Sequence, residues 1–362
     1  MVMLRVKLLA SLAVVVVHAS AADPVISQVA EFGDQQPTGV AVCAVGRIFV
    51  NFPRWRDDVP VSVAEILADG ALKPFPDRAW NEWRPGSAPD EHFVCVQSVH
   101  YDGAGTLWVL DAASPKMEGV VSGGAKLVQI DLADNRLRRV VRFDESIALP
   151  GSYLNDVRIS PDSRHAFITD SGAGAIVVVE LESGASRRLL DGHASVQADG
   201  RRELEVEGKK LLAGGATPRI HADGIALSPD GAWLYWHPLT GDALWRAPTA
   251  SLIDPALTSE ALAATVERVA DTGAHDGIEF GRDGKLYLTR FETSEIARFD
   301  PTTKAVETVV RDPRLSWPDS IAFQGDRVLL VTASQIQHMP RFNDGVDTRT
   351  EPYRLWRIEL SR

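Results

Sequence analysis

Aspartates recur at one position of a repeated sequence pattern, and two of them follow closely on a histidine. The pattern is His-x-Asp-Gly at residues 221–224 and His-Asp-Gly at residues 275–277. Carboxylates that crowd one site repel each other, so some of them must be paired, protonated or bound to a cation. Such a cluster suits proton transfer, for which the candidates are His221, His275 and Asp156, or the binding of a hard cation through oxygen ligands.

The complete set of these positions takes one place in each of six copies of the pattern. The positions are Thr38, Gln97, Asn155 with Asp156, Asp223, Asp276 and Asp319, and Trp317 lies just before the last. We predict that they converge, with the two histidines, at one end of a central channel. A structural interpretation stays open for each aspartate, because its carboxylate can also accept hydrogen bonds from nearby backbone N–H groups.

The elements that must position these residues are pairs of short strands. Each copy starts with a polar and a small residue, and apolar residues then alternate with the period of a half-buried strand. A turn, such as Ser-Pro-Asp-Gly at residues 228–231, leads into a second strand. Successive copies are 43–68 residues apart, which is the size of a four-stranded propeller blade. We therefore predict an all-β fold, a six-bladed β-propeller of four-stranded blades over residues 22–362.

A closed ring also needs its two ends joined. Only one clear strand, residues 355–360, follows the last copy, whereas a strand-like segment at residues 25–32 precedes the first. We predict that this N-terminal strand becomes the outer strand of the last blade. Closure of this kind pairs two sheet edges that would otherwise be bare.

The first residues have the pattern of a secretory signal. Arg5 and Lys7 precede an apolar run at residues 8–17 and Ala-Ser-Ala at residues 19–21, which together are typical of a cleaved signal peptide. A buried N-terminal strand is the alternative. We predict a signal peptide over residues 1–21 and a secreted or periplasmic protein that has no membrane contact once the signal is removed.

Composition narrows the choice of partner. The chain has 38 Lys and Arg residues against 49 Asp and Glu residues, a formal net charge of −11. An acidic surface repels the phosphates of nucleic acid, which is therefore not an expected partner. A small-molecule ligand at the channel is the expected partner, and the sequence does not specify an oligomeric state.

The two cysteines are predicted to stay unpaired. Relative to the repeat, Cys43 and Cys95 are offset by seven residues, which is roughly 23 Å along a strand. A disulfide needs Cα atoms within about 7 Å of each other.

Two insertions lie outside the repeat. Residues 80–84, Trp-Asn-Glu-Trp-Arg, are expected to pack on a blade edge, with stacking on a planar ligand as the alternative. The longest insertion, residues 186–220, is locally basic, and both a cap over the channel mouth and a solvated hairpin remain open for it.

Several segments of the repeat resemble the major royal jelly protein and insect yellow protein family, in its bacterial branch. They are residues 37–42 with 48–55, 97–99 with 107–111, 153–157 with 167–172, 192–197 and 223–228. The resemblance implies an exported six-bladed propeller with a ligand site at one end of its channel. It also implies either tautomerase action on dopachrome or the binding of small amines.

A more distant resemblance is to the gluconolactonase and senescence-marker-like propellers. It implies a divalent cation such as calcium on the channel axis. By blade order, Asp223 and Asp276 match two metal positions, and Asn155 matches a substrate contact whose amide oxygen would be a further ligand. Thr38 stands where that family has a glutamate, and a hydroxyl is a poor substitute on a hard cation.

Three functions follow from these observations. The first is a small-molecule site at the channel mouth, with isomerase- or tautomerase-like activity or ligand binding, in which His221 or His275 is the general base if no cation binds. The second is a metal-dependent lactonase or hydrolase. The third is a non-catalytic extracellular binding protein, for which ligand binding without turnover would be the evidence.

Overall fold

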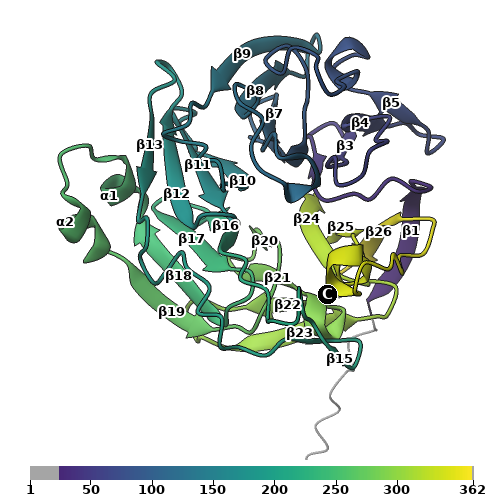
Figure 1. Cartoon of the computed structure of the whole chain (residues 1–362). Helices are drawn as coiled ribbons and strands as arrows, with labels where there is room; N and C mark the ends of the chain where they lie inside the picture. The colour runs from purple at the N-terminus through teal and green to yellow at the C-terminus, as the bar shows by residue number, and fades with distance from the viewer. Residues whose placement is uncertain (1–23, 361–362) are drawn as a thin grey trace, which may run out of the picture.

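The computed structural model describes residues 24–360, and the predicted signal peptide lies outside this range. Six antiparallel four-stranded sheets stand around a central axis as the blades of a β-propeller (Figure 1). The innermost strand of each blade lies beside the innermost strands of both neighbouring blades, so the ring is closed. The predicted fold class is confirmed.

Each blade runs from an inner strand at the channel to an outer strand at the rim. Blade 1 contains, in that order, β2 (Val40–Val42), β3 (Ile48–Asn51), β4 (Val63–Ile66) and β5 (Leu72–Pro74). Blade 2 contains β6 (Val96–Tyr101), β7 (Thr106–Asp111), β8 (Lys126–Asp131) and β9 (Arg136–Arg142). Blade 3 contains β10 (Leu154–Ile159), β11 (His165–Asp170), β12 (Ala175–Glu180) and β13 (Ser186–Leu189).

The second half of the ring follows the same order. Blade 4 contains β16 (Ala222–Leu227), β17 (Trp233–Pro238), β18 (Ala243–Pro248) and β19 (Glu267–Asp271). Blade 5 contains β20 (Ile278–Phe280), β21 (Leu286–Arg290), β22 (Glu295–Phe299) and β23 (Val306–Arg311). Blade 6 contains β24 (Pro318–Gln324), β25 (Val328–Ala333), β26 (Arg354–Glu359) and, outermost, β1 (Val25–Glu31).

The N-terminal strand closes the ring as predicted. β1 pairs antiparallel with β26, from Val25 opposite Glu359 to Glu31 opposite Arg354. Figure 1 shows this purple strand beside the yellow C-terminal strands. The pairing completes the sixth blade with a strand from the other end of the described chain.

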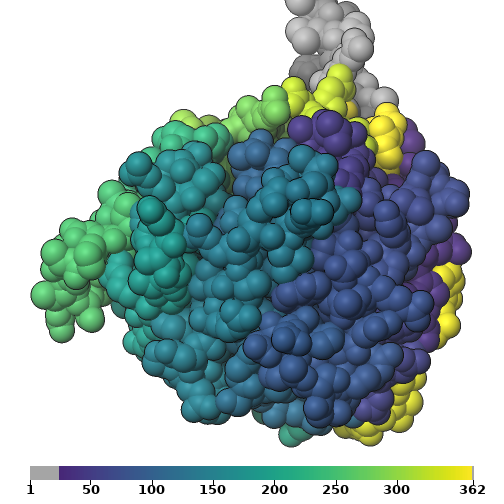
Figure 2. All heavy atoms as spheres, turned by 90° about the horizontal axis from the view of Figure 1, so that it is seen from above, coloured from purple at the N-terminus to yellow at the C-terminus, as the bar shows by residue number. Residues whose placement is uncertain are grey.

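The remaining elements are short. A two-stranded hairpin consists of β14 (Glu205–Val206) and β15 (Lys209–Lys210), and the α-helices are α1 (Thr249–Ile253) and α2 (Ser259–Ala263). Figures 1 and 2 both show the green segment with these helices projecting from the rim of the propeller. The 3₁₀ turns are η1 (Ala79–Asn81), η2 (Pro115–Met117), η3 (Phe291–Thr293), η4 (Ile336–His338) and η5 (Pro340–Phe342). Within residues 24–360, no helix is long and apolar enough to cross a membrane.

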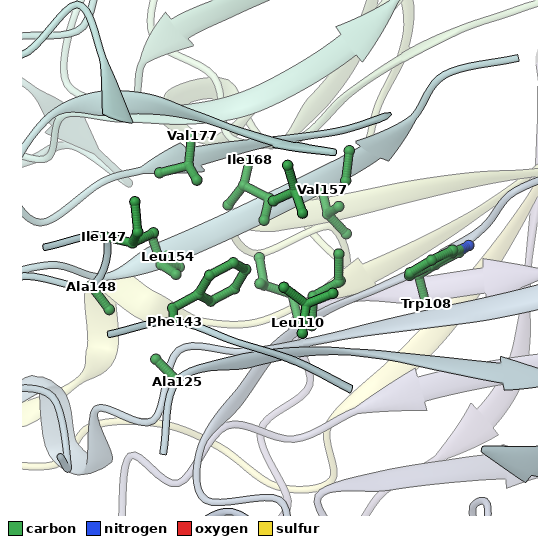
Figure 3. Packing of buried hydrophobic residues seen from close by; sticks show 14 of the residues in the cluster. Trp108, Leu110, Ala125, Phe143, Ile147, Ala148, Leu154, Val157, Ile168 and Val177 are labelled. Carbon is green, nitrogen blue, oxygen red and sulfur yellow. The ribbon is translucent and has the colours of Figure 1, made fainter. Parts of the chain in front are cut away.

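The core lies between neighbouring blades. Side chains from blade 2, including Trp108 and Leu110, pack against Leu154, Val157 and Ile168 of blade 3 (Figure 3). Successive strand residues point to opposite faces, so alternate residues of each blade meet the next blade. Burial of side chains of this size contributes about 1.5–3 kcal/mol each, which holds the ring without a disulfide.

Both cysteines are free and buried, as predicted. The tryptophans of the 80–84 loop lie on a blade edge, since the ring centroids of Trp80 and Phe93 are 5.0 Å apart and Trp83 is buried under the Arg54 guanidinium. Neither tryptophan belongs to the walls of the cavities described below.

Candidate functional site

One mouth of the channel opens into a cavity of about 490 Å³, which we call the acidic cavity. Its polar wall comes from the first residues of the inner strands. These residues are Gln97, Asn155, Asp223, Asp276 and Asp319. Its aromatic wall comes from residues around them. They are Trp55, Tyr153, Trp317 and Phe342. A concave site of this volume suits a small organic ligand.

A β-bulge sits at the start of most inner strands and explains how these side chains reach the cavity. In blade 4, Asp223 and Gly224 together stand opposite the single residue His237, because Ala222 pairs with Pro238 and Ile225 with Trp236. Comparable register shifts occur at the same place in blades 2, 3 and 6. A bulge re-aims the side chains of the residues it contains.

The glycine that follows the aspartate in blades 4 and 5 is required by the packing of one blade against the next. A Cβ atom on Gly224 would lie 2.2 Å from the backbone oxygen of Asp276, and one on Gly277 would lie 2.4 Å from that of Asp319. Only glycine lets the next blade approach so closely. In the Asp-Gly pattern, the glycine therefore allows close contact between blades, and the aspartate supplies a side chain to the cavity.

Hydrogen bonds between blades fix the backbone at these positions. The hydroxyl of Thr289 donates to the backbone oxygen of Asp319 at 2.9 Å. In the same way, the hydroxyl of Thr332 donates to the backbone oxygen of Thr38 at 2.6 Å. His237 takes the equivalent place in blade 4, where its Nε2 lies 2.9 Å from the backbone oxygen of Asp276. The second strand of one blade thus fixes the residue at the start of the inner strand of the next blade. The backbone of the site is therefore held by the same contacts that hold the ring together.

Each aspartate of the acidic cavity has a specific hydrogen-bond donor. Asn155 Nδ2 donates to Asp223 Oδ2 at 2.7 Å, Trp317 Nε1 to Asp276 Oδ2 at 2.7 Å, and Ser334 Oγ to Asp319 Oδ2 at 3.0 Å. The three aspartates are all buried. Burial is the main cause that holds the pKa of each carboxyl group well above its usual range, and repulsion among the neighbouring carboxylates adds to it.

Asp223 and Asp276 form a pair. Burial raises the pKa of both carboxyl groups well above the usual range, and repulsion from the Asp223 carboxylate raises that of Asp276 further. A proton shared between two buried carboxyl groups can be passed to, or taken from, a bound ligand.

We expect this acid cluster to make the protein more stable at mildly acidic pH than at neutral pH. The ordinary pKa of the three aspartates is 3.8, and their folded-state values are raised. Their contribution to stability is complete below the unfolded pKa and is lost as the pH rises through the folded pKa. Urea unfolding should therefore give a higher midpoint at about pH 5 than at about pH 7.5. Asp276→Asn should reduce the difference between the two midpoints. A midpoint that rises from acidic to neutral pH in both proteins would contradict this expectation.

The predicted histidines lie off the wall of the acidic cavity. His275 is fully buried, with Nε2 2.9 Å from the Thr272 hydroxyl and its ring 3.5 Å from that of His237. Burial lowers the pKa of His275 well below its usual value, and the neighbouring His237 lowers it further. His221 is half-buried, and its Nδ1 accepts from the backbone N–H of Ala198 at 3.1 Å. Neither ring lines the acidic cavity, and burial lowers the pKa of both.

Two further predicted residues lie elsewhere. Thr38 is fully buried behind the wall, where its hydroxyl donates to the backbone oxygen of Gln97 at 2.8 Å and accepts from Asn51. Asp156 lines a second cavity at the opposite mouth, with Arg158 as its nearest cation. The structure therefore brings together Gln97, Asn155, Asp223, Asp276, Asp319 and Trp317, and places Thr38 and the two histidines off this wall. Asp156 lines the other cavity but is close enough for its charge to raise the pKa of all three aspartates.

Sequence reasoning missed the residues that complete the cavity. Trp55 Nε1 donates to the Tyr153 hydroxyl at 2.7 Å, and that hydroxyl donates to Gln97 Oε1 at 2.9 Å. Arg219 and Arg341 also line the wall. Trp55 and Tyr153 lie in the segments that carry the family resemblance, which was the available signal, whereas neither arginine belongs to any repeated position.

The 186–220 insertion begins with β13, contains the β14–β15 hairpin and packs beside this mouth, where only Arg219 and Ile220 of its residues line the cavity. Leu204, Val206 and Leu211 are buried in the same cluster as Trp55, Tyr153 and Trp317 of the cavity wall. Arg202 forms ion pairs with Asp242 and Glu292, both at 2.5 Å, which fasten the insertion to blades 4 and 5. The insertion is therefore neither a free solvated hairpin nor a cap over the channel, because it is packed on the side of the mouth.

The donor set does not fit a tightly held metal ion. The amide group of Asn155 faces Asp223 through its nitrogen, Asp276 accepts from Trp317, and the Thr38 hydroxyl is turned away from the cavity. In the part of the chain that the structure describes, no three His, Cys, Asp or Glu side chains are grouped so as to hold a metal. Calcium needs six to eight oxygen ligands at 2.3–2.6 Å, so no chemical step is derived through one.

The fold and this cavity define a class of protein, the six-bladed propellers with a ligand-sized acidic and aromatic site at one channel mouth. The sequence model of the family described as "Major royal jelly protein" matches residues 94–361, which is well over half of the chain. The chain belongs to the major royal jelly protein family.

Relatives and solved structures agree with this assignment. Protein yellow of Drosophila melanogaster is 26% identical over 235 residues, which cover 59% of this chain and 41% of that protein. The chain thus spans about two fifths of the length of the curated relatives it matches. A gluconolactonase from Xanthomonas campestris superposes with a TM-score of 0.56 at 15% identity, covering 94% of this chain and 91% of its own. The calcium-binding protein regucalcin from Agrobacterium tumefaciens gives a TM-score of 0.53 at 16% identity, with coverage of 92% and 94%. At these identities, the two structures support the fold alone.

Proposed function

We propose that the acidic cavity binds a small aromatic amine in its protonated form. The observation that carries the proposal is the pair Asp223 and Asp276, buried side by side and facing a wall of aromatic rings. An ammonium group would give these buried carboxyl groups a cationic partner, and charge-assisted hydrogen bonds of this kind are about twice as strong as neutral ones. The ring of the ligand would lie against the aromatic wall.

The charges of the cavity wall favour a cation over an anion. Asp223, Asp276, Asp319 and Glu118 stand against only two arginines, Arg219 and Arg341. The aromatic wall is held in place before a ligand arrives, because Trp317 stacks on Phe291 with centroids 4.1 Å apart and Tyr153 is bonded to both Trp55 and Gln97. A wall that is already ordered costs little conformational entropy on binding.

The test compares two ligands that differ in one group. Tyramine and tyrosol share a phenol ring and a two-carbon chain, and they end in an ammonium and a hydroxyl group respectively. Isothermal titration should show tyramine binding at least about tenfold more tightly, a difference of about 1.4 kcal/mol. Equal affinity for the two ligands would mean that the carboxylates do not select a cation, and would overturn the proposal.

A tautomerase activity is the second candidate, and one specific observation favours it. Asp223 and Asp276 are neighbouring buried carboxyl groups whose pKa values are both raised, and a pair of this kind can add a proton at one atom of a ligand and remove one at another. Dopachrome conversion by the purified protein, lost in Asp276→Asn, is the expected result. Amine binding without conversion would leave a binding protein.

We also propose export of the mature chain from the cell. The charge and apolar pattern of residues 1–21 supports it. Expressed with its own N-terminus, the protein should be recovered outside the cytoplasm with a chain that begins near residue 22, as read by N-terminal sequencing. Recovery of the full-length chain in the cytoplasm would contradict export.

A further inference from the structure

The opposite mouth of the channel holds a second cavity of about 500 Å³, which we call the far cavity. It is formed where the inner strands end, so it shares no wall residue with the acidic cavity. The residues that matter for its chemistry are Tyr101, Asp156, Arg158, Glu279, Phe280 and Phe323. They come from blades 2, 3, 5 and 6.

Arg158 is the central group of the far cavity. It is only 8% exposed, and it reaches across the channel from blade 3 to blade 5. Its Nη2 donates to the backbone oxygen of Ile278 at 2.9 Å, and its Nη1 donates to that of Val157 at 2.9 Å. Its Nε is buried, and within residues 24–360 no atom accepts a hydrogen bond from it. A ligand in the cavity can therefore reach this guanidinium only through its Nη groups, which carry four hydrogens in all and donate two of them to these backbone oxygens.

Two carboxylates flank this guanidinium and give the far cavity a second requirement. Glu279 Oε2 lies 3.1 Å from Arg158 Nη2, and Asp156 Oδ2 lies 4.0 Å from Arg158 Nη1. The oxygens of an ionised carboxylate offer about four acceptor positions, and few of these are used at this mouth. A ligand that satisfies the whole cluster must therefore donate to the carboxylates and accept from Arg158.

Charge decides which ligand meets both requirements. An anion would be attracted by Arg158 and by the more exposed Arg282 of the same wall but repelled by Asp156 and Glu279, and a simple cation would meet the reverse. A hydroxyl group is neutral and carries one donor and two acceptor positions. Several hydroxyl groups on one carbon skeleton would therefore satisfy all three side chains at once.

The apolar rings of the far cavity fit the other face of such a ligand. Phe280 packs edge-on against Tyr235 with centroids 5.2 Å apart, and Phe323 packs edge-on against Tyr287 at 5.1 Å. Both rings are only half-buried, and they line the cavity together with Tyr101. Rings fixed in this way offer flat apolar surfaces beside the charged cluster.

We propose that the far cavity is a second, independent binding site for a neutral polyhydroxylated small molecule, that is, a mono- or disaccharide. The site does not depend on the function proposed for the acidic cavity. Its ligand contacts Arg158 through an oxygen, Asp156 and Glu279 through hydroxyl hydrogens, and the aromatic rings through its C–H face.

The experiment is a titration of the full chain with D-glucose, D-galactose, sucrose and glycine, followed by saturation-transfer NMR. At least one of the sugars should bind at millimolar concentration and glycine should not. Arg158→Met and Glu279→Gln should each weaken that sugar at least about tenfold. The matched controls Arg187→Met and Glu65→Gln, which lie outside both cavities, should leave its binding unchanged.

Glu279→Gln keeps the proposal testable if Arg158→Met fails to fold, because it preserves the size of the side chain. Absence of binding by all three sugars would overturn the proposal. So would binding of glycine in preference to the sugars, or sugar binding that survives Glu279→Gln. Tyramine binding should be the same in Glu279→Gln as in the unaltered protein, which separates this site from the acidic cavity.

Discussion

Asp223→Asn is expected to weaken tyramine binding about 10- to 100-fold, because one charge-assisted hydrogen bond contributes about 1.5–3 kcal/mol. The substitution keeps the shape of the side chain and its bond to Asn155, which donates to it at 2.7 Å. It also removes a buried carboxyl group whose raised pKa reports an unfavourable charge. The melting temperature at neutral pH should therefore stay the same or rise.

The matched control is Asp90→Asn, a half-exposed aspartate whose nearest cation, Arg142, is 3.9 Å away. It should change neither tyramine affinity nor melting temperature. Retained affinity in Asp223→Asn would remove this carboxylate from the binding site. A large loss of stability in the same variant would instead make Asp223 a structural residue.

Lys126→Met should have the largest effect on stability, a loss of about 3–5 kcal/mol in the free energy of unfolding. Lys126 and Asp111 form an ion pair at 2.8 Å in which both side chains are fully buried. Lys126 Nζ also donates to the backbone oxygens of Pro89 and Gly124. Removing the ammonium leaves the buried Asp111 carboxylate without its counter-charge. This carboxylate also accepts from the backbone N–H groups of Val94 and Cys95, which lead into β6 and Gln97.

Urea denaturation of Lys126→Met gives the measurement, and Lys210→Met is its control. Lys210 pairs with Glu203 on the surface, so its loss should not change the unfolding midpoint measurably. A midpoint for Lys126→Met equal to that of the control would show that the buried pair contributes no net stability.

The fold was predictable because it is repeated. Each blade must place one strand against the channel and turn three more outward, so a polar residue followed by the same alternation recurs wherever a blade begins, with Asp-Gly itself in blades 4 and 5. Closure by residues 25–31 followed from counting strands at the two ends of the repeat. Repetition makes even weak local signals decisive, since six copies must agree.

The same repetition predicts part of the acidic cavity and no more. Asn155, Asp223, Asp276 and Asp319 meet because equivalent positions in a ring meet. His275 does not join them, because neighbouring residues of an extended chain point to opposite sides and the side chain before a cavity-facing aspartate enters the blade.

Other parts of both cavities depend on residues that no repeat relates. The cavity arginines Arg219 and Arg341 follow and precede irregular segments, so their approach to the mouth is decided by loop packing. Arg158 has the sequence pattern of the exposed residue of an alternating strand, yet it is buried because the channel is narrow enough for it to bond Ile278 on the far side. Tertiary distances of this kind have no local signature.

A crystal structure of the protein with tyramine tests the central claim most directly. The account predicts that the ammonium nitrogen lies within about 3 Å of a carboxylate oxygen of Asp223 or Asp276, with the phenol ring against Trp317 or Tyr153. Density for tyramine at any other place, or a metal ion held between Asp223 and Asp276 in its stead, would contradict it.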